Sequence, residues 1–122
     1  MITGIRDVFY NVQDMNRALE FYQNTLGLKT GYVSEYWTSL LLDGVNIGLH
    51  WTGGQKVPHV PRDSHGSHAG ATLTLKSDNI AEDRMRIEQG GGKVLGEADE
   101  HWGHMLVFED LDGNVLKLMK PK

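Results

Sequence analysis

The chain has no cysteine, only three prolines and no excess of basic residues. The lack of cysteine excludes a disulfide framework, a thiolate metal site and a cysteine nucleophile. Its 122 residues include 12 lysines and arginines against 16 aspartates and glutamates, which gives a formal net charge of −4 at pH 7. Because no positive field attracts a phosphate backbone, nucleic acid is not an expected partner.

Long apolar runs are also missing. No segment approaches the length of about 20 apolar residues that a membrane-spanning helix needs, so no membrane partner is expected. The first residues lack the basic and then apolar pattern of a secretory leader, and we expect a cytoplasmic protein. With 39% hydrophobic residues, the chain can form one domain with a real core and is too short for two ordinary ones.

The first half of the chain carries the pattern of a strand, a helix and three strands. Residues 5–12 have strand composition, and Asp14 is a good N-cap for a helix over about 15–26, where apolar residues recur at spacings of three and four. Gly27 suits a left-handed C-cap. Strands are then expected at 29–35, 36–42 and 45–51, with Asp43-Gly44 as a hairpin turn.

The second half repeats this order of elements. Residues 71–76 alternate like a strand, Asp78 is expected to cap a helix over about 79–89, and three glycines end that helix. Further strands are expected at 93–98, 104–109 and 115–119, with a turn at 111–114. Residues 52–70, rich in Gly, Pro, His and Ser, connect the halves. The sequence therefore predicts a single α+β domain over 1–122, built from two βαβββ units at 1–51 and 71–122.

Alternate side chains of a strand point to opposite faces of its sheet, so each strand divides into a helix-packed set and a second set. Candidate core residues are Val8, Tyr10 and Val12 in the first strand, and Leu73, Leu75, Leu116 and Leu118 in the second half. The other face collects most of the polar strand residues, among them Asp7, Asn11, Asn46, His50, Thr72, Thr74 and Lys117.

Two segments with recognisable motifs lie at the two ends of this domain. Residues 7–14 (DVFYNVQD) run into 21–28 (FYQNTLGL), and residues 107–114 (VFEDLDGN) run into 115–118 (VLKL). Together they resemble the vicinal oxygen chelate superfamily, which includes glyoxalase I, bleomycin-resistance proteins, fosfomycin-resistance enzymes and extradiol dioxygenases. The resemblance covers almost the whole chain. It implies that the two units form one cup-shaped mixed sheet, with helices on the convex face and the site inside the cup.

Members of this family that bind a metal take ligands from the first and fourth strands, from the strand that opens the second half, and from the last strand. The matching positions here are Asp7, Gly48, Thr72 and Lys117, with His50 two residues beyond Gly48 on the same face. Of these residues only Asp7 and His50 are common metal ligands. Gly48 has no side chain, the neutral hydroxyl of Thr72 is a poor ligand, and a protonated Lys117 offers no lone pair. We therefore expect no metal or other cofactor, with a divalent metal as the alternative.

The same comparison of positions predicts that Asp7 and Lys117 approach each other. The resembled fold brings ligands from the first and last strands together, and an ammonium group can take the electrostatic role of the cation. Pairing would offset the cost of placing both charges in a partly buried cup. Such a fixed positive group favours ligands with a carboxylate or phenolate near His50.

Four further histidines form the pairs His65 and His68, and His101 and His104. A spacing of three suits one face of a helix, but on a strand it puts the two rings on opposite faces. Neither pair is therefore a ready-made chelate.

Three tryptophans and three glutamates lie outside the two segments that carry the resemblance. Trp37, Trp51 and Trp102 can line a pocket for a planar ligand, or can instead fill a core or a dimer seam. Glu35, Glu97 and Glu100 are interpreted as solvated charges at strand ends or in loops. Because small relatives usually complete or shield their cups by pairing, we also expect a homodimer.

The sequence leaves three functions open. The first is a bleomycin-resistance-like protein that binds a small organic molecule in a cup with a degenerate metal site. The second is a metal-dependent lyase, isomerase or dioxygenase that uses Asp7 and His50 with unconventional further ligands. The third is a metal-free proton-transfer enzyme with His50 as the base and Lys117 as an electrostatic stabiliser. The predicted ligand-binding residues are Asp7, Phe9, Asn11, Asn46, His50, Thr72, Thr74, Trp102, Lys117 and Met119.

Overall fold

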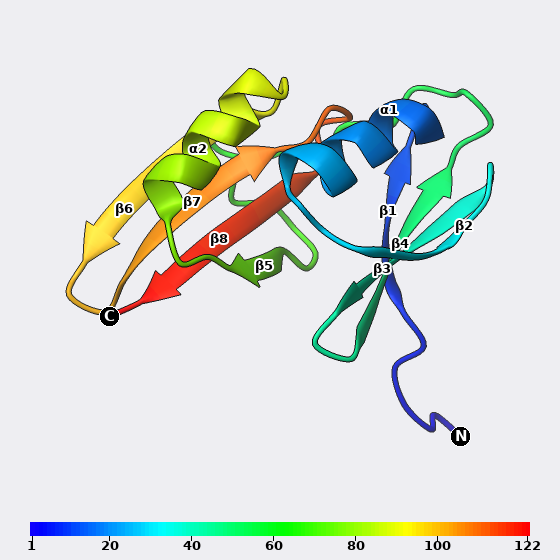
Figure 1. Ribbon diagram of the computed structural model, residues 1–122, viewed down its shortest axis with the longest axis horizontal. Coiled ribbons are helices and arrows are strands. Elements are labelled where there is room, and N and C mark those ends of the chain that lie inside the picture. The colour runs from blue at the N-terminus through cyan, green and yellow to red at the C-terminus, as the bar shows by residue number, and fades with distance from the viewer. The chain divides into compact units, whose positions relative to one another are not determined.

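The computed structural model describes residues 1–122 and divides into two compact units, Met1–Val57 and Pro58–Lys122. Each unit contains one helical segment and four strands (Figure 1). Hydrogen bonding divides the eight strands between two four-stranded mixed sheets, one in each unit. The predicted α+β class and both βαβββ units are confirmed. No helix has both the length and the apolar character needed to cross a membrane.

The sheet of the first unit has the strand order β1-β4-β3-β2. Its strands are β1 (Val8–Val12), β2 (Thr30–Val33), β3 (Trp37–Leu42) and β4 (Val45–Trp51). β1 pairs with β4 in parallel, and the other neighbours are antiparallel. Asp43 and Gly44 have φ angles of 48° and 76°. Both are left-handed, as the tight turn of a two-residue hairpin requires.

The helical segment of the first unit begins with α1 (Met15–Leu19) and continues as the π-helix η1 (Glu20–Thr25). The Asp14 carboxylate accepts the backbone N–H of Arg17 at 3.1 Å, which confirms the predicted N-cap. Gly27 has a φ of 73°, the left-handed conformation expected after the last turn. The predicted helix over 15–26 is confirmed in extent, while its π-helical half is not visible in the spacing of apolar residues.

The sheet of the second unit has the order β5-β8-β7-β6, and α2 (Ile80–Gln89) covers one face of it (Figure 1). Its strands are β5 (Leu73–Lys76), β6 (Lys93–Glu100), β7 (Gly103–Glu109) and β8 (Val115–Pro121). The prediction that Asp78 caps the helix is wrong. The cap is Asn79, whose side-chain oxygen accepts the N–H of Glu82 at 3.0 Å, because only this residue immediately precedes the first helical turn.

Each sheet buries the face that packs against its own helix. The buried strand residues are Val12, Leu40, Ile47 and Leu49 in the first unit, and Leu106, Phe108, Leu116 and Leu118 in the second. Tyr10, Leu73 and Leu75 are half-buried. The prediction that Val8 belongs to the core is wrong, since its side chain is 44% exposed at the first residue of an edge strand.

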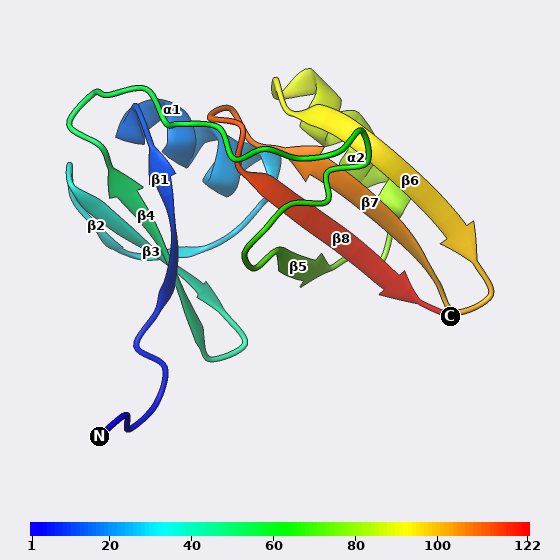
Figure 2. The ribbon, with the colours of Figure 1, turned by 180° about the vertical axis from the view of Figure 1, so that it is seen from behind.

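Part of the predicted connection folds onto the second sheet, on the face opposite α2 (Figure 2). Asp63 organises a tight turn there, because its Oδ1 accepts the backbone N–H groups of His65 and Ser67, each at 2.9 Å. These bonds from Ser67 and His65 hold the pKa of Asp63 below its ordinary value. A Cβ at Gly66 would come within 2.9 Å of the Val107 side chain, so the turn lies directly against β7.

Truncating a phenylalanine to alanine is expected to destabilise the protein by different amounts on the two faces of the first sheet. Phe21 is 1% exposed between helix and sheet, whereas Phe9 is 48% exposed on the opposite face. We expect Phe21→Ala to lower the free energy of unfolding by about 3–5 kcal/mol, and Phe9→Ala by about 1 kcal/mol or less. Denaturant unfolding of both variants measures the difference. Equal losses would contradict this assignment of faces.

Candidate functional site

Three aromatic side chains meet on the face of the first sheet that points away from α1. The ring centroids of Phe9 and Trp37 lie 5.5 Å apart, those of Phe9 and His50 lie 5.7 Å apart, and those of Trp37 and His50 lie 6.3 Å apart. These distances are within the range of favourable aromatic contacts. The strand register brings the rings together, since Phe9 is paired with Gly48 and Trp37 with His50. We call these three residues the aromatic cluster.

Gly48 lies directly beneath the indole of Trp37. A Cβ at Gly48 would come within 2.1 Å of the indole ring, so only glycine lets the ring occupy this position. The indole N–H donates to Oγ of Ser39 at 3.2 Å, which fixes its orientation. Gly48 is also the fourth-strand position at which the family resemblance implies a metal ligand. In this chain an indole fills the space in front of that position.

His50 is oriented by Asn11, its neighbour across the β1–β4 pair. The ring Nδ1 lies 3.0 Å from Oδ1 of Asn11. Because an amide oxygen only accepts hydrogen bonds, Nδ1 carries the proton and the lone pair of the neutral ring is on Nε2. His50 is exposed. Its Nε2 is therefore the atom of this cluster that can accept a proton or a hydrogen bond from a bound molecule.

Asp7 lies at the other end of this face from His50. The register that pairs Val8 with Ile47 continues to place Asp7 beside Asn46, and the Asn46 amide donates to the backbone oxygen of Arg6 at 3.3 Å. Four strand positions, or about 13 Å, separate this level from His50. The Asp7 carboxylate pairs instead with Arg6 at 2.5 Å. The structure does not bring Asp7 and His50 together as joint ligands.

The predicted site residues of the second unit lie on or near the face opposite α2. Thr74 is paired with Lys117 across β5 and β8, and Met119 is the next residue of β8 on this face. Thr72 precedes β5, and its hydroxyl lies 3.2 Å from Nε2 of His68. Trp102 occupies the β6–β7 turn and is 46% exposed. Because Asp7 and Lys117 belong to different units, their approach stays a prediction.

The positions implied by the resemblance do not supply the donors of a divalent metal site. Neither unit gathers three His, Asp or Glu side chains that could hold a metal ion. In the first unit Gly48 has no side chain and is covered by Trp37. In the second unit the Thr72 hydroxyl is a poor neutral ligand, and the ammonium of Lys117 has no lone pair.

His104 serves the structure of the second unit and does not face the site residues. It shares the α2-packed face with Leu106, and its Nε2 lies 2.6 Å from Oε2 of Glu97. Arg84 of α2 donates to the other oxygen of Glu97 at 2.6 Å. These bonds, from Arg84 first and His104 second, hold the pKa of Glu97 below its ordinary value. Glu97 is exposed, as the sequence predicted, and the register of β6 also brings it beside α2, where it pairs with Arg84 and His104.

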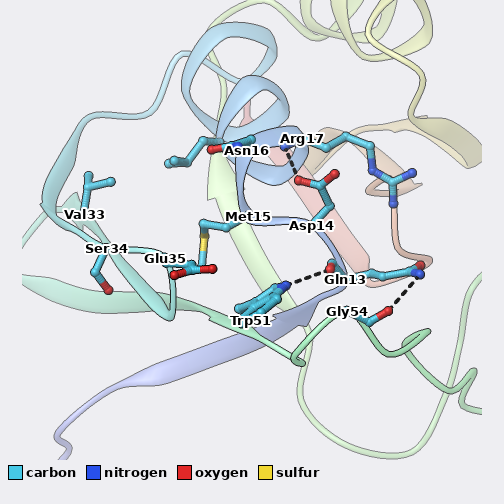
Figure 3. Close-up of a pocket in the computed structure, with 11 residues that line it drawn as sticks. Gln13, Asp14, Met15, Asn16, Arg17, Val33, Ser34, Glu35, Trp51 and Gly54 are labelled. Atoms are coloured by element: carbon cyan, nitrogen blue, oxygen red, sulfur yellow. Dashed lines mark hydrogen bonds between the residues drawn. The ribbon is translucent and has the colours of Figure 1, made fainter.

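A cavity of about 840 Å³ lies at the start of α1 (Figure 3). Its walls come from residues 13–17 and 33–35, with Leu19, Trp51 and Gly54. Trp51 lies among them, on the helix-packed side of β4, one residue after His50 and so on the opposite face of the strand. The sequence named Trp51 as a candidate pocket residue. It did not predict this cavity, because three separate segments build it.

The contact between Gly48 and Trp37 predicts a non-additive pair of substitutions. Gly48→Ala is expected to lower the free energy of unfolding by about 1–3 kcal/mol, because the added methyl group must displace the indole. In a Trp37→Ala background the same substitution is expected to cost much less, since the space is then open. Denaturant unfolding of the four proteins of this double-mutant cycle measures the coupling. The same cost in both backgrounds would show that the indole lies elsewhere.

Comparison with known proteins places this geometry in a family. Lactoylglutathione lyase of Salmonella typhimurium is 31% identical over 126 residues, which cover 91% of this chain and 87% of that protein. Metallothiol transferase FosB of Staphylococcus epidermidis is 25% identical over 124 residues, which cover 97% of this chain and 84% of that protein. The structure of FosX of Listeria monocytogenes, complexed with Mn(II) and sulfate, is similar to this chain with a TM-score of 0.72 at 21% identity. The match covers 100% of this chain and 93% of the FosX chain.

The FosX likeness shows the fold alone at this level of identity. Because that structure is a manganese complex, the comparisons do not support the expectation that no cofactor is used. The sequence profile of the Glyoxalase/Bleomycin resistance protein/Dioxygenase superfamily matches residues 4–118, which is nearly the whole chain. The resemblance carried by the two segments at the ends of the domain is confirmed. The chain belongs to the Glyoxalase/Bleomycin resistance protein/Dioxygenase superfamily.

Proposed function

We propose that this protein binds a small, planar aromatic molecule that carries a hydroxyl group, with the aromatic cluster of the first unit as the binding surface. The observation that carries the proposal is the exposure of this cluster. Phe9 is 48% exposed beside a half-buried Trp37 and an exposed His50. Contiguous exposed apolar surface costs free energy in water, and a flat ligand stacked against these rings would remove it.

The polar groups beside the rings support a ligand with a hydroxyl. The Nδ1–H of His50 is used by Asn11, so Nε2 offers its lone pair to a donor. A phenolic hydroxyl is such a donor, and it can hydrogen-bond to Nε2 while its ring lies against Phe9 or Trp37. The exposed side chain of Asn46 lies on the same face of β4, two residues before Gly48. It can pair with a second polar substituent.

Thr72, Thr74, Trp102, Lys117 and Met119 remain ligand-binding residues predicted from the sequence. A positive Lys117 would favour a ligand that binds as a phenolate or carries a carboxylate. Homodimer formation likewise remains a prediction from the family resemblance.

A metal-dependent enzyme is the second candidate function, because the similar FosX structure is a Mn(II) complex and the similar Salmonella protein is a lyase. The donors of this chain argue against it, since Asp7 and His50 lie at different levels of the β1–β4 pair and Trp37 covers Gly48. Metal-free proton transfer is the third candidate. It is supported by the contact of His50 Nδ1 with Asn11, which leaves Nε2 of the neutral ring as the atom that can act as a general base toward a bound hydroxyl.

Binding of 2-naphthol tests the proposal, with 2-methoxynaphthalene as the matched compound that lacks the donor. We expect the wild-type protein to bind 2-naphthol more tightly by about twofold to tenfold, the worth of one hydrogen bond. Phe9→Ala is expected to weaken 2-naphthol binding by about 0.5–1.5 kcal/mol through the lost ring contact. Val8→Ala changes the opposite face of β1 and should leave the affinity unchanged. Isothermal titration calorimetry measures each dissociation constant.

His50→Phe separates stacking from hydrogen bonding, because it keeps an aromatic ring and removes Nε2. We expect this variant to bind both compounds with the same affinity. A retained preference for 2-naphthol would show that another group accepts the hydroxyl. Equal affinities for wild type and Phe9→Ala would contradict the aromatic cluster as the binding surface.

Manganese distinguishes the first two candidate functions. We expect 2-naphthol to bind with the same affinity to protein treated with a chelator and to the same protein after addition of Mn(II), because the described residues offer no set of metal ligands. The measurement is the same titration, combined with metal analysis of the purified protein. Binding that requires Mn(II), and is lost in Asp7→Ala, would favour the metal-dependent enzyme.

A further inference from the structure

The cavity at the start of α1 is independent of the aromatic cluster. Trp51 contributes to it from the helix-packed face of β4, while His50 lies on the other face of the same strand. Its volume of about 840 Å³ is within the range of sites that hold small organic molecules. None of the residues assigned to the proposed function lines it.

The base of the cavity is aromatic and fixed in orientation. The indole N–H of Trp51 donates to the backbone oxygen of Gln13 at 3.0 Å. The ring centroids of Trp51 and Tyr36 lie 5.6 Å apart. Trp51 is half-buried. Met15 adjoins it, and Figure 3 shows its thioether close to the indole. A rigid indole with its donor already used offers its ring face to a ligand.

The charge beside this ring is negative. Glu35 is exposed, and Figure 3 shows its carboxylate directed toward Met15 and Trp51. Asp14 adds a second carboxylate, one oxygen of which caps α1 by accepting the N–H of Arg17. The guanidinium of Arg17 is directed away from Glu35 in the same view.

We propose that this cavity is a second binding site and that its ligand is a small organic ammonium ion with a flat or apolar body. A cation near the face of an indole is attracted by the ring quadrupole, and Trp is the most effective of the aromatic residues in this role. The carboxylate of Glu35 would pair with the ammonium, while the apolar body covers Trp51 and Met15. The carboxylates of Glu35 and Asp14 repel anions, so this site favours a cation. Lys117, in contrast, would favour an anionic ligand.

The test is a titration with 2-phenylethylammonium, with neutral 2-phenylethanol as the matched control compound. Binding is followed by the NMR signal of the Trp51 indole N–H, which is assigned by a Trp51→Phe variant. We expect the ammonium compound to shift this signal and to bind at least about threefold more tightly than the alcohol. Glu35→Gln should weaken its binding by about twofold to fivefold, the range for an exposed ion pair.

Two variants serve as controls for this titration. Glu100→Gln makes the same charge change at an exposed carboxylate of the second unit and should leave the affinity unchanged. Phe9→Ala should also leave it unchanged, which separates this site from the proposed function. Equal affinities for the ammonium and the alcohol would overturn the proposal, as would equal effects of Glu35→Gln and Glu100→Gln. A shift confined to the Trp37 signal would place the ligand on the other face and would also overturn it.

Discussion

The candidate site depends on one steric fact, the absence of a Cβ at Gly48. Because Gly48 has no Cβ, the indole of Trp37 can lie close against β4, where a Cβ would come within 2.1 Å of the ring. The indole, on β3, then contacts His50 on the adjacent strand β4 and Phe9 on β1, the strand beyond it. One glycine thus places an aromatic surface where the family resemblance implies a metal ligand.

The alternation of β4 gives the first unit two chemically different surfaces. His50 and Trp51 are adjacent in sequence but point to opposite faces, so one belongs to the aromatic cluster and the other to the cavity beside α1. The first surface offers a neutral acceptor at Nε2, whereas the second is edged by carboxylates. The two faces of this seven-residue strand therefore carry different side-chain chemistry.

The second unit repeats the topology of the first without repeating its surface. Its face opposite α2 carries Thr74, Lys117 and Met119 in place of an aromatic cluster. Part of that face is covered, because Gly66 brings the Asp63 turn against Val107. Its paired charges lie on the other side, where Glu97 joins His104 to Arg84. Two units with one strand order can thus diverge freely in the side chains that do not pack on a helix.

The sequence by itself determined the fold, because periodicity, caps and turns are local. Asp14, Gly27 and the Asp43-Gly44 turn lie where their backbone preferences require. It also separated the faces of β1 and β4, so Phe9, Asn11 and His50 were correctly placed on one side. Only the tertiary structure decided that Trp37 covers Gly48 and that Asp7 lies far from His50, because strand register is set by pairing across the sheet. The cavity of Trp51 and Glu35 also required three segments distant in sequence to pack together, which no local pattern encodes.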